Sequence, residues 1–190
     1  MSDAIAITCP LTDPSVLLSL RAGTMVRVSG TLLTARDAAH ARLHQLAQDG
    51  CPLPVSFHNQ ALYYTGPAPA PPGFIIGAVG PTTASRMDPY TPALLAKGLK
   101  VMIGKGERSA AVISAMVQHQ AIYLGAIGGI GALLSQTVQH ARVVAFEDLG
   151  PEAMYELVVK DFPTVVLIDT IGEMYYRKGQ VPYRTRLPPL

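Results

Sequence analysis

The chain has 190 residues, of which 49% are hydrophobic and 15% are charged, and its formal net charge is +2. This length can bury a core of useful size, while the small net charge, the lack of a basic block and the lack of tryptophan argue against nucleic-acid or membrane-surface binding. An average globular protein is roughly 25% charged, so the low value predicts a surface partly covered by a partner, with an alanine-rich composition as the alternative.

Signals for strands and helices alternate along the first half of the chain. Apolar residues at helical spacing predict a helix over residues 37–49, and Gly50 follows as the expected stop. Alternating apolar residues predict a pair of strands over 24–35 that turn at Gly30. The other expected elements are a short helix or turn over 15–22, a strand over 61–65, a proline-rich loop over 67–72 and a strand over the apolar run 74–79.

The second half continues this alternation. Thr91 and Pro92 offer a start for a helix that Gly98 ends. The further expected elements are strands over 101–103, 122–124 and 142–146, helices over 110–119 and 132–139, a short helix from residue 151, a hairpin or edge pair formed by 157–160 and 165–169, and an extended tail over 177–190. The pattern predicts an α/β fold, and since no linker or internal repeat divides the chain, we expect one domain over residues 1–190.

A candidate anion site begins at the Gly-Pro-Thr-Thr motif of residues 80–83. A turn that opens a helix leaves backbone N–H groups without intrahelical partners, and Thr82 or Thr83 can cap them. Arg86, one turn later, offers a planar pair of donors that matches a carboxylate or a phosphate. An ordinary capped turn beside a solvated arginine is the alternative.

Two further cations stand where an expected strand meets a helix. Arg36 follows the strand that ends near residue 35, and Lys105 lies between two glycines after the strand over 101–103. Ligands of open α/β sheets collect at the carboxyl ends of strands, so we expect Arg36, Arg86 and Lys105 to converge. Three unpaired cations are costly, which predicts a small dianion, a dicarboxylate or a phosphate, as their ligand.

Four segments together carry a family resemblance: residues 35–40, 80–88, 104–109 and 123–129. In this order and with little gapping, they resemble the C-terminal, or β, part of class I iron–sulfur-dependent fumarases, a family that includes the β subunits of tartrate dehydratases. The likeness covers residues 23–172, and its last two segments look more like the fumarase version. Ser85 stands where glycine is expected, and Glu107 where fumarases more often have asparagine.

The resemblance implies a compact swivelling β/β/α domain with a mixed sheet flanked by helices. It implies the β subunit of a hydro-lyase that interconverts fumarate and (S)-malate and is active only with an α subunit that holds a 4Fe–4S cluster. Thr82 becomes the candidate catalytic base, although a threonine hydroxyl is a poor base unless its environment lowers its pKa. Arg36, Arg86 and Lys105 become the residues that hold the substrate carboxylates, and Thr83 is a further candidate substrate-binding residue.

Two other functions remain open beside this one. The chain can be the β subunit of a tartrate dehydratase or a related diacid hydro-lyase, because the diacids differ only by hydroxyl groups. It can also be a carboxylate-binding module without catalytic activity. Copurification separates this module from a hydro-lyase subunit, since a partner that carries an iron–sulfur cluster makes the complex brown.

The residues of the chain itself predict no metal or cofactor site. Cys9 and Cys51 are too few for a cluster that needs three or four thiolates, so the cluster is expected on the partner subunit. His40 and His44 stand one helical turn apart, but no third ligand is evident, and amphipathic or surface positions are expected. The glycine-rich stretches match neither a P-loop nor a dinucleotide fingerprint.

Several features bear on location and partners. Asp3 stands where a signal peptide would carry basic residues, and two cysteines without such a peptide are typical of reduced, buried thiols in a cytoplasmic protein, with a single disulfide as the alternative. The uncharged run over 121–140 contains polar residues and four glycines, so it is a poor membrane span. The expected partners are a cluster-bearing α subunit and a small dicarboxylate, in a hetero-oligomer, with a homodimer as the alternative for the isolated chain.

Overall fold

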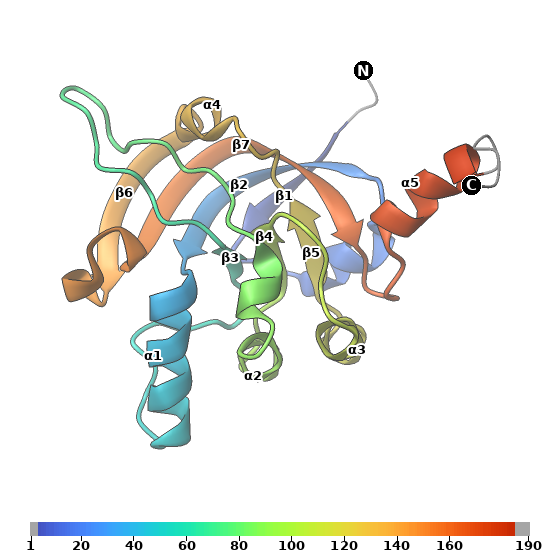
Figure 1. The fold of residues 1–190 in the computed structure, drawn as a ribbon, viewed down its shortest axis with the longest axis horizontal. Coiled ribbons are helices and arrows are strands. Elements are labelled where there is room, and N and C mark those ends of the chain that lie inside the picture. The colour runs from blue at the N-terminus through green and yellow to red at the C-terminus, as the bar shows by residue number, and fades with distance from the viewer. Residues whose placement is uncertain (1–3, 185–190) are drawn as a thin grey trace.

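The structure is a computed structural model that describes residues 4–184, and these residues form a seven-stranded mixed sheet with helices around it (Figure 1). The strands are β1 (Ile5–Cys9), β2 (Met25–Thr34), β3 (Ala61–Tyr63), β4 (Val101–Gly104), β5 (Ile122–Gly125), β6 (Val138–Ala145) and β7 (Met154–Ile168). The α-helices are α1 (Asp37–Gln48), α2 (Thr91–Ala96), α3 (Ala110–His119), α4 (Gly131–Ser135) and α5 (Tyr175–Arg184). Three short 3-10 helices are η1 (Pro14–Ser19), η2 (Ala84–Met87) and η3 (Glu147–Glu152).

Strands β1 to β5 pair in parallel, whereas β7 runs antiparallel to β2, β5 and β6. Because β7 pairs with both β2 and β5, the strands β2, β3, β4, β5 and β7 form a closed ring of pairings. In Figure 1 the long strands β2, β6 and β7 arch over β3, β4 and β5, and α1, α2 and α3 lie below. The mixed sheet with flanking helices confirms the predicted fold class.

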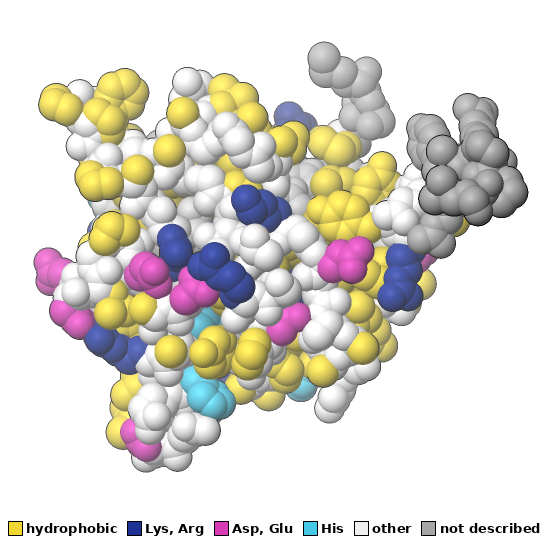
Figure 2. Space-filling view, viewed as in Figure 1, with side chains coloured by type: hydrophobic (Ala, Val, Ile, Leu, Met, Phe, Trp, Pro, Cys, Tyr) yellow, Lys and Arg dark blue, Asp and Glu magenta, His cyan; other side chains and the backbone are white. Residues whose placement is uncertain are grey.

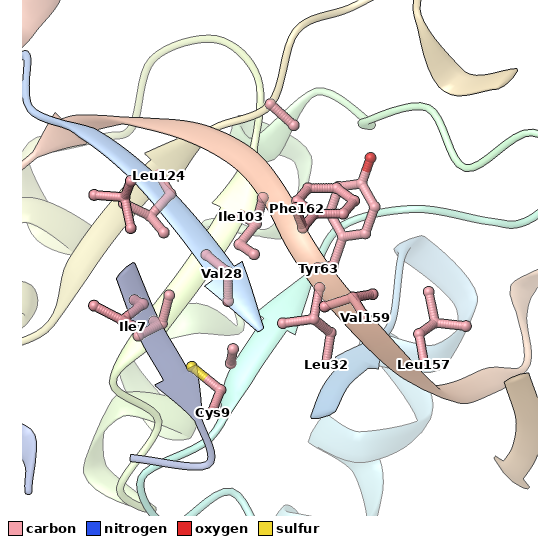
Figure 3. Close-up of a cluster of buried hydrophobic side chains, with 14 of the residues drawn as sticks. Ile7, Cys9, Val28, Leu32, Tyr63, Ile103, Leu124, Leu157, Val159 and Phe162 are labelled. Atoms are coloured by element: carbon pink, nitrogen blue, oxygen red, sulfur yellow. The ribbon is translucent and has the colours of Figure 1, made fainter. Parts of the chain in front are cut away.

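Apolar clusters lie on both faces of the parallel strands. Side chains alternate between the two faces of a strand, so Leu32 enters the cluster under the arch and Leu33 enters the cluster against the helices. Figure 3 shows the cluster under the arch, where the ring of Tyr63 lies 5.2 Å from the ring of Phe162. Burial on both faces explains why the short strands read as continuous apolar runs.

The apolar run 74–79 does not form the strand predicted for it. Phe74 and Ile75 are 68% and 54% exposed. The chain instead folds back on itself, with Gly77 N donating to Ala68 O at 3.1 Å. A Cβ at Gly77 would lie 2.6 Å from this oxygen, and the preceding prolines lack the N–H groups that a strand ladder needs. The segment is therefore a loop with apolar side chains on its surface.

The turns predicted at Gly30 and within 157–169 are β-bulges inside long strands. Val28 is paired with Phe162 and Gly30 with Val159, so β7 has one residue more than β2 in this interval. Gly30 has a φ of 91° and Asp161 a φ of 54°. Residues that favour positive φ are typical of turns, but here they bend two paired strands. The predicted strand pair and hairpin are wrong, because β2 and β7 are each one continuous strand.

Most other predicted elements are confirmed, namely η1, α1, α2, α3 and the strands β3, β4, β5 and β6. α4 is shorter than the helix predicted over 132–139, because Val138 already pairs with Val159 at the start of β6. β1, which has no predicted counterpart, adds to β2. No helix within residues 4–184 combines the length and the apolar character needed to cross a membrane.

The predicted extended tail is wrong for its first part, since the chain is helical as far as Arg184 in α5. Lys178 N donates to Met174 O at 3.1 Å, and the Lys178 ammonium pairs with Glu173 at 3.0 Å. Pro182, one of the three prolines that favour an extended tail, lies in the last turn of α5, where few helical hydrogen bonds remain to be lost. The rest of the predicted tail, residues 185–190, lies outside the described residues.

Candidate active site

The carboxyl ends of the parallel strands meet at one edge of the sheet and carry two of the predicted cations. Arg36 is two residues beyond β2, and Lys105 directly follows β4. Arg86 comes to the same place from η2, since its guanidinium pairs with Asp37, the neighbour of Arg36 in the chain. Arg36, Arg86 and Lys105 are called the cation cluster below.

Backbone hydrogen bonds fix the Gly-Pro-Thr-Thr segment between the ends of β3 and β4. Thr82 N donates to Tyr64 O at 2.7 Å, and Lys105 N donates to Thr82 O at 3.3 Å. Thr83 forms a parallel bridge with Lys105, and Ala84 N donates to Lys105 O at 2.9 Å. The segment thus extends the edge of the sheet, although the strand predicted before it, over residues 74–79, does not form.

The two threonine hydroxyls are not used as helix caps, contrary to the prediction. Thr83 is the N-cap residue of η2 but makes no side-chain cap hydrogen bond. Thr82 is half-buried, Thr83 is exposed, and neither hydroxyl has a hydrogen-bond partner among the residues described. Both hydroxyls are therefore available to a ligand.

Arg36 is held between two carboxylates. Its Nε lies 3.3 Å from Asp37 Oδ2, and its Nη2 lies 3.4 Å from Glu152 Oε1. Glu152 Oε2 also accepts from Ala38 N at 2.8 Å, which ties η3 to the first turn of α1. The arginine lies against Gly66, where a Cβ would approach its Cδ to 2.8 Å. A Cβ at this position would also lie 2.9 Å from the backbone oxygen of Pro151, which cannot move as a side chain can, so residue 66 favours glycine.

Arg86 binds the carboxylate of Asp37 with two donors. Its Nε donates to Oδ1 at 2.7 Å, and its Nη2 donates to Oδ2. The hydrogen bonds from Arg86 hold the pKa of Asp37 at about 2, well below its usual range, although partial burial opposes this shift. Arg36 and Arg86 therefore share Asp37 as a counter-ion within the chain, which the argument for a dianion did not take into account.

Lys105 is exposed, and it is the member of the cation cluster that has no counter-ion among the described residues. No ion pair or side-chain hydrogen bond of its ammonium group occurs within the part of the chain that the structure describes. A Cβ at Gly128 would lie 3.7 Å from Lys105 Cδ, so the glycine-rich turn after β5 borders this side chain. Three cations and two carboxylates, those of Asp37 and Glu152, leave one formal positive charge. Figure 2 shows basic and acidic side chains side by side above the start of α1.

A buried charge network below the cluster was missed by the sequence reasoning. The side chain of Arg108 is 0% exposed and its Nε donates to Asp88 Oδ1 at 2.7 Å. Its Nη2 donates to Thr91 Oγ1 at 2.6 Å and its Nη1 to Tyr64 OH at 3.1 Å. Because Asp88 Oδ2 accepts from Ser109 N at 2.7 Å, the network joins η2 to the start of α3. The only sequence signal was that Asp88 and Arg108 both lie in segments of the family resemblance.

His40 is a second buried polar group, which corrects the expected amphipathic or surface position. Its Nδ1 lies 3.0 Å from Arg36 O, so this nitrogen carries the proton and donates. Nε2 is buried and has no hydrogen-bond partner among the described residues. The ring packs against Tyr64 and Tyr90, with centroids 5.5 Å and 5.9 Å away. Burial lowers the pKa of His40 to about 4, although the hydrogen bond to Arg36 opposes the shift.

The buried His40 predicts a loss of stability in mild acid. Since its pKa is lower in the folded chain than in the unfolded chain, the unfolded state binds the extra proton between about pH 6.5 and pH 4. The contribution of His40 to the free energy of unfolding should therefore fall by about 3 kcal/mol as the pH is lowered across that window. Urea unfolding at several pH values should show a smaller acid loss for His40→Gln than for wild type, and His44→Gln, on the same helix, should behave as wild type. Equal losses in all three proteins would contradict the prediction.

The chain matches a known family over most of its length. The family model described as Fumarase C-terminus matches residues 5–179. An anaerobic class I fumarate hydratase of Escherichia coli is 40% identical over 157 residues, which cover 82% of this chain and 29% of that protein. Fumarate hydratase 2 of Leishmania major is 40% identical over 158 residues, with 82% and 28% covered. This chain thus spans less than a third of the length of these two fumarate hydratases.

A second kind of relative is similar in length to this chain. A putative L(+)-tartrate dehydratase subunit beta of Methanocaldococcus jannaschii is 30% identical over 165 residues. The match covers 84% of this chain and 85% of that subunit.

The residues of this chain do not fit an iron–sulfur cluster. Such clusters are held by cysteine thiolates. Cys9 is buried in the core, where burial raises its pKa to about 12 and keeps the thiol protonated. Cys51 is exposed, so the buried position expected for both thiols is wrong for this residue. In residues 4–184 no group of three His, Cys, Asp or Glu side chains is placed to hold a metal ion.

Proposed function

Because the chain belongs to the fumarase C-terminus family, we propose that it is the carboxylate-binding β component of a hydro-lyase that interconverts fumarate and (S)-malate. The observation that carries this proposal is the cation cluster beside Thr82 at the carboxyl edge of the parallel strands. A small dicarboxylate matches an edge that offers two guanidinium groups, together with an ammonium group and two hydroxyls that have no partner among residues 4–184.

Each member of the cation cluster has a role in this proposal. Arg36 and Arg86 direct their remaining N–H donors to one substrate carboxylate, and Lys105 attracts the substrate as a mobile charge. Thr83, which is bridged to Lys105 through the backbone, offers a hydroxyl to the same ligand. These contacts orient the four-carbon diacid before it reacts, so less entropy is lost between the bound substrate and the transition state.

Thr82 is the proposed base that takes the proton from the carbon next to the hydroxyl-bearing carbon of malate. Its carbonyl oxygen accepts from Lys105 N, so the two residues are backbone neighbours, and an ammonium group brought close to the hydroxyl would favour its deprotonated form. Its half-buried position keeps part of the surrounding water away. In the reverse direction the same hydroxyl returns the proton to fumarate.

The proposed activity needs an α component, because the cysteines of this chain do not fit the cluster. Large apolar side chains of Phe74, Ile75, Ile127 and Leu133 are 54% to 68% exposed, and Ile127 lies in the glycine-rich turn that borders Lys105. Such side chains are typical of a surface that a partner covers. Both cysteines are free, which is consistent with the reduced thiols of a cytoplasmic complex.

Turnover tests the proposal directly. The chain is expressed without oxygen, with and without its candidate cluster-bearing partner, and the conversion of malate to fumarate is followed at the absorbance of fumarate. We expect turnover only in the mixture. No turnover in a mixture whose cluster is intact would contradict the malate reaction.

A tartrate dehydratase is the second candidate, because the match covers 85% of the subunit beta from Methanocaldococcus jannaschii. The same assay with L(+)-tartrate in place of malate distinguishes the two substrates. A chain that purifies colourless and alone, and that binds fumarate without turnover, would instead be a carboxylate-binding module.

A further inference from the structure

One carboxylate of this chain contacts both arginines of the cation cluster. Asp37 Oδ1 accepts from Arg86 Nε at 2.7 Å, and Asp37 Oδ2 accepts from Arg86 Nη2 and lies 3.3 Å from Arg36 Nε. Arg36 and Arg86 are 50 positions apart in the sequence, one before β3 and the other after it. Asp37 contacts both and so joins them. A counter-ion in this place decides how the two guanidinium groups are oriented.

We propose that Asp37 is a positioning residue that holds Arg36 and Arg86 by their Nε sides and so leaves the Nη1 nitrogen of both guanidinium groups to the substrate carboxylate. The inference rests on the proposed function above. It concerns a residue that binds the arginines and does not touch the reacting atoms.

The donors that Asp37 leaves unused support this role. A guanidinium group has five N–H donors. A carboxylate that binds on the Nε side leaves the two N–H donors of Nη1 without a partner. For both Arg36 and Arg86, Nη1 makes no hydrogen bond within the described residues. A second carboxylate can therefore bind at Nη1 while Asp37 stays in place.

Glu152 completes the arrangement on the far side of Arg36. It binds Arg36 Nη2 at 3.4 Å and the backbone of Ala38 at 2.8 Å, so it fixes the arginine to the start of α1. Arg36 is thus held from two sides, whereas Arg86, which is 47% exposed, is held by Asp37 alone among the described residues. The removal of Asp37 should release Arg86 most.

Charge and orientation give opposite expectations for Asp37→Asn. The substitution raises the formal charge of the cluster, together with Asp37 and Glu152, from +1 to +2. If charge alone governed binding, a dianion would bind more tightly. If Asp37 acts by positioning, binding should weaken, because the Arg86 side chain regains its rotational freedom.

The experiment compares the full chain with Asp37→Asn and with Asp148→Asn as the matched control. Asp148 also binds an arginine with both oxygens, since Arg42 Nη1 and Nη2 donate to it at 2.7 and 2.8 Å, but it contacts no member of the cation cluster. Fumarate is titrated calorimetrically, and the arginine Nε–H signals are recorded by NMR on 15N-labelled protein. For Asp37→Asn we expect about tenfold weaker fumarate binding and faster solvent exchange of the Arg86 Nε–H, with neither change in Asp148→Asn.

The outcomes separate this inference from the function on which it rests. Unchanged or tighter fumarate binding by Asp37→Asn would overturn the positioning role while wild-type binding still supports the carboxylate site. An unchanged Arg86 Nε–H signal would overturn it as well, because the pair would then not exist in solution. Failure of the wild-type chain to bind fumarate, together with no turnover beside the partner, would contradict the proposed function itself.

Discussion

Replacement of Asp88 by alanine is expected to lower the free energy of unfolding by about 3 to 5 kcal/mol, because it leaves a buried guanidinium group without its carboxylate. The Arg108 side chain is 0% exposed and that of Asp88 is 12% exposed. The other hydrogen-bond partners of Arg108, Tyr64 and Thr91, are neutral and cannot balance its charge. The substitution also removes the acceptor of Ser109 N at the start of α3.

Urea unfolding followed by circular dichroism measures this effect. Asp148→Ala is the matched control, because it removes a carboxylate that binds an arginine on the surface, where Asp148 is 66% exposed. The control should lose much less, because water screens an exposed ion pair. The double variant Asp88→Ala with Arg108→Met removes both buried charges and should recover part of the loss. If Asp88→Ala were no more destabilising than the control, the buried network would not have the role assigned to it.

Helices and short strands of this fold can be predicted because their signals are local. The α3 helix combines a run of apolar residues with Ser109, whose hydroxyl accepts from Val112 N, and its end at Gln120 has a φ of 51°. The strands β4 and β5 are buried on both faces, so they read as apolar runs bounded by glycine. These segments need no knowledge of their neighbours.

The long strands could not be predicted, because what decides them is pairing between distant segments. Gly30 and Asp161 show the local signal of a turn, and only the pairing of β2 with β7 makes each site a bulge. The run that begins at Phe74 has the composition of a strand, yet the backbone bonds of Phe74, Gly77 and Ala78 go to a neighbouring part of their own loop. Apolar composition alone does not provide a strand with a partner.

The candidate site is predictable in its cations and not in its counter-ions. Arg36 and Lys105 follow strands whose carboxyl ends must meet in a parallel sheet, and this rule places them at one edge. Glu152 reaches Arg36 from η3, at a sequence separation that no motif reports. Asp37 was visible beside Arg36, but its bond to Arg86 depends on where η2 lies. Sequence therefore overestimates the positive charge of the site.

In the complex with the cluster-bearing partner, Arg86→Ala is expected to reduce kcat/KM for malate roughly 30-fold to 5000-fold. This corresponds to a loss of about 2 to 5 kcal/mol of transition-state stabilisation. The substitution removes a charged group that is proposed to bind a substrate carboxylate. It also leaves Asp37 with only Arg36 as a partner, so an unbalanced carboxylate then repels the diacid. Both effects act in the same direction, which is why a single exposed arginine should matter this much.

Steady-state kinetics of matched variants separates the role of Arg86 from a general loss of charge. Arg42→Ala removes an arginine that also binds an aspartate with two donors, but outside the cation cluster, and it should leave kcat/KM unchanged. Arg86→Lys keeps the charge and loses the planar pair of donors, so its kcat/KM should lie between wild type and Arg86→Ala. A value for Arg86→Ala equal to wild type would remove Arg86 from the site. A value for Arg86→Lys equal to wild type would show that Arg86 acts as a point charge, and the bidentate geometry imposed by Asp37 would then have no part in binding.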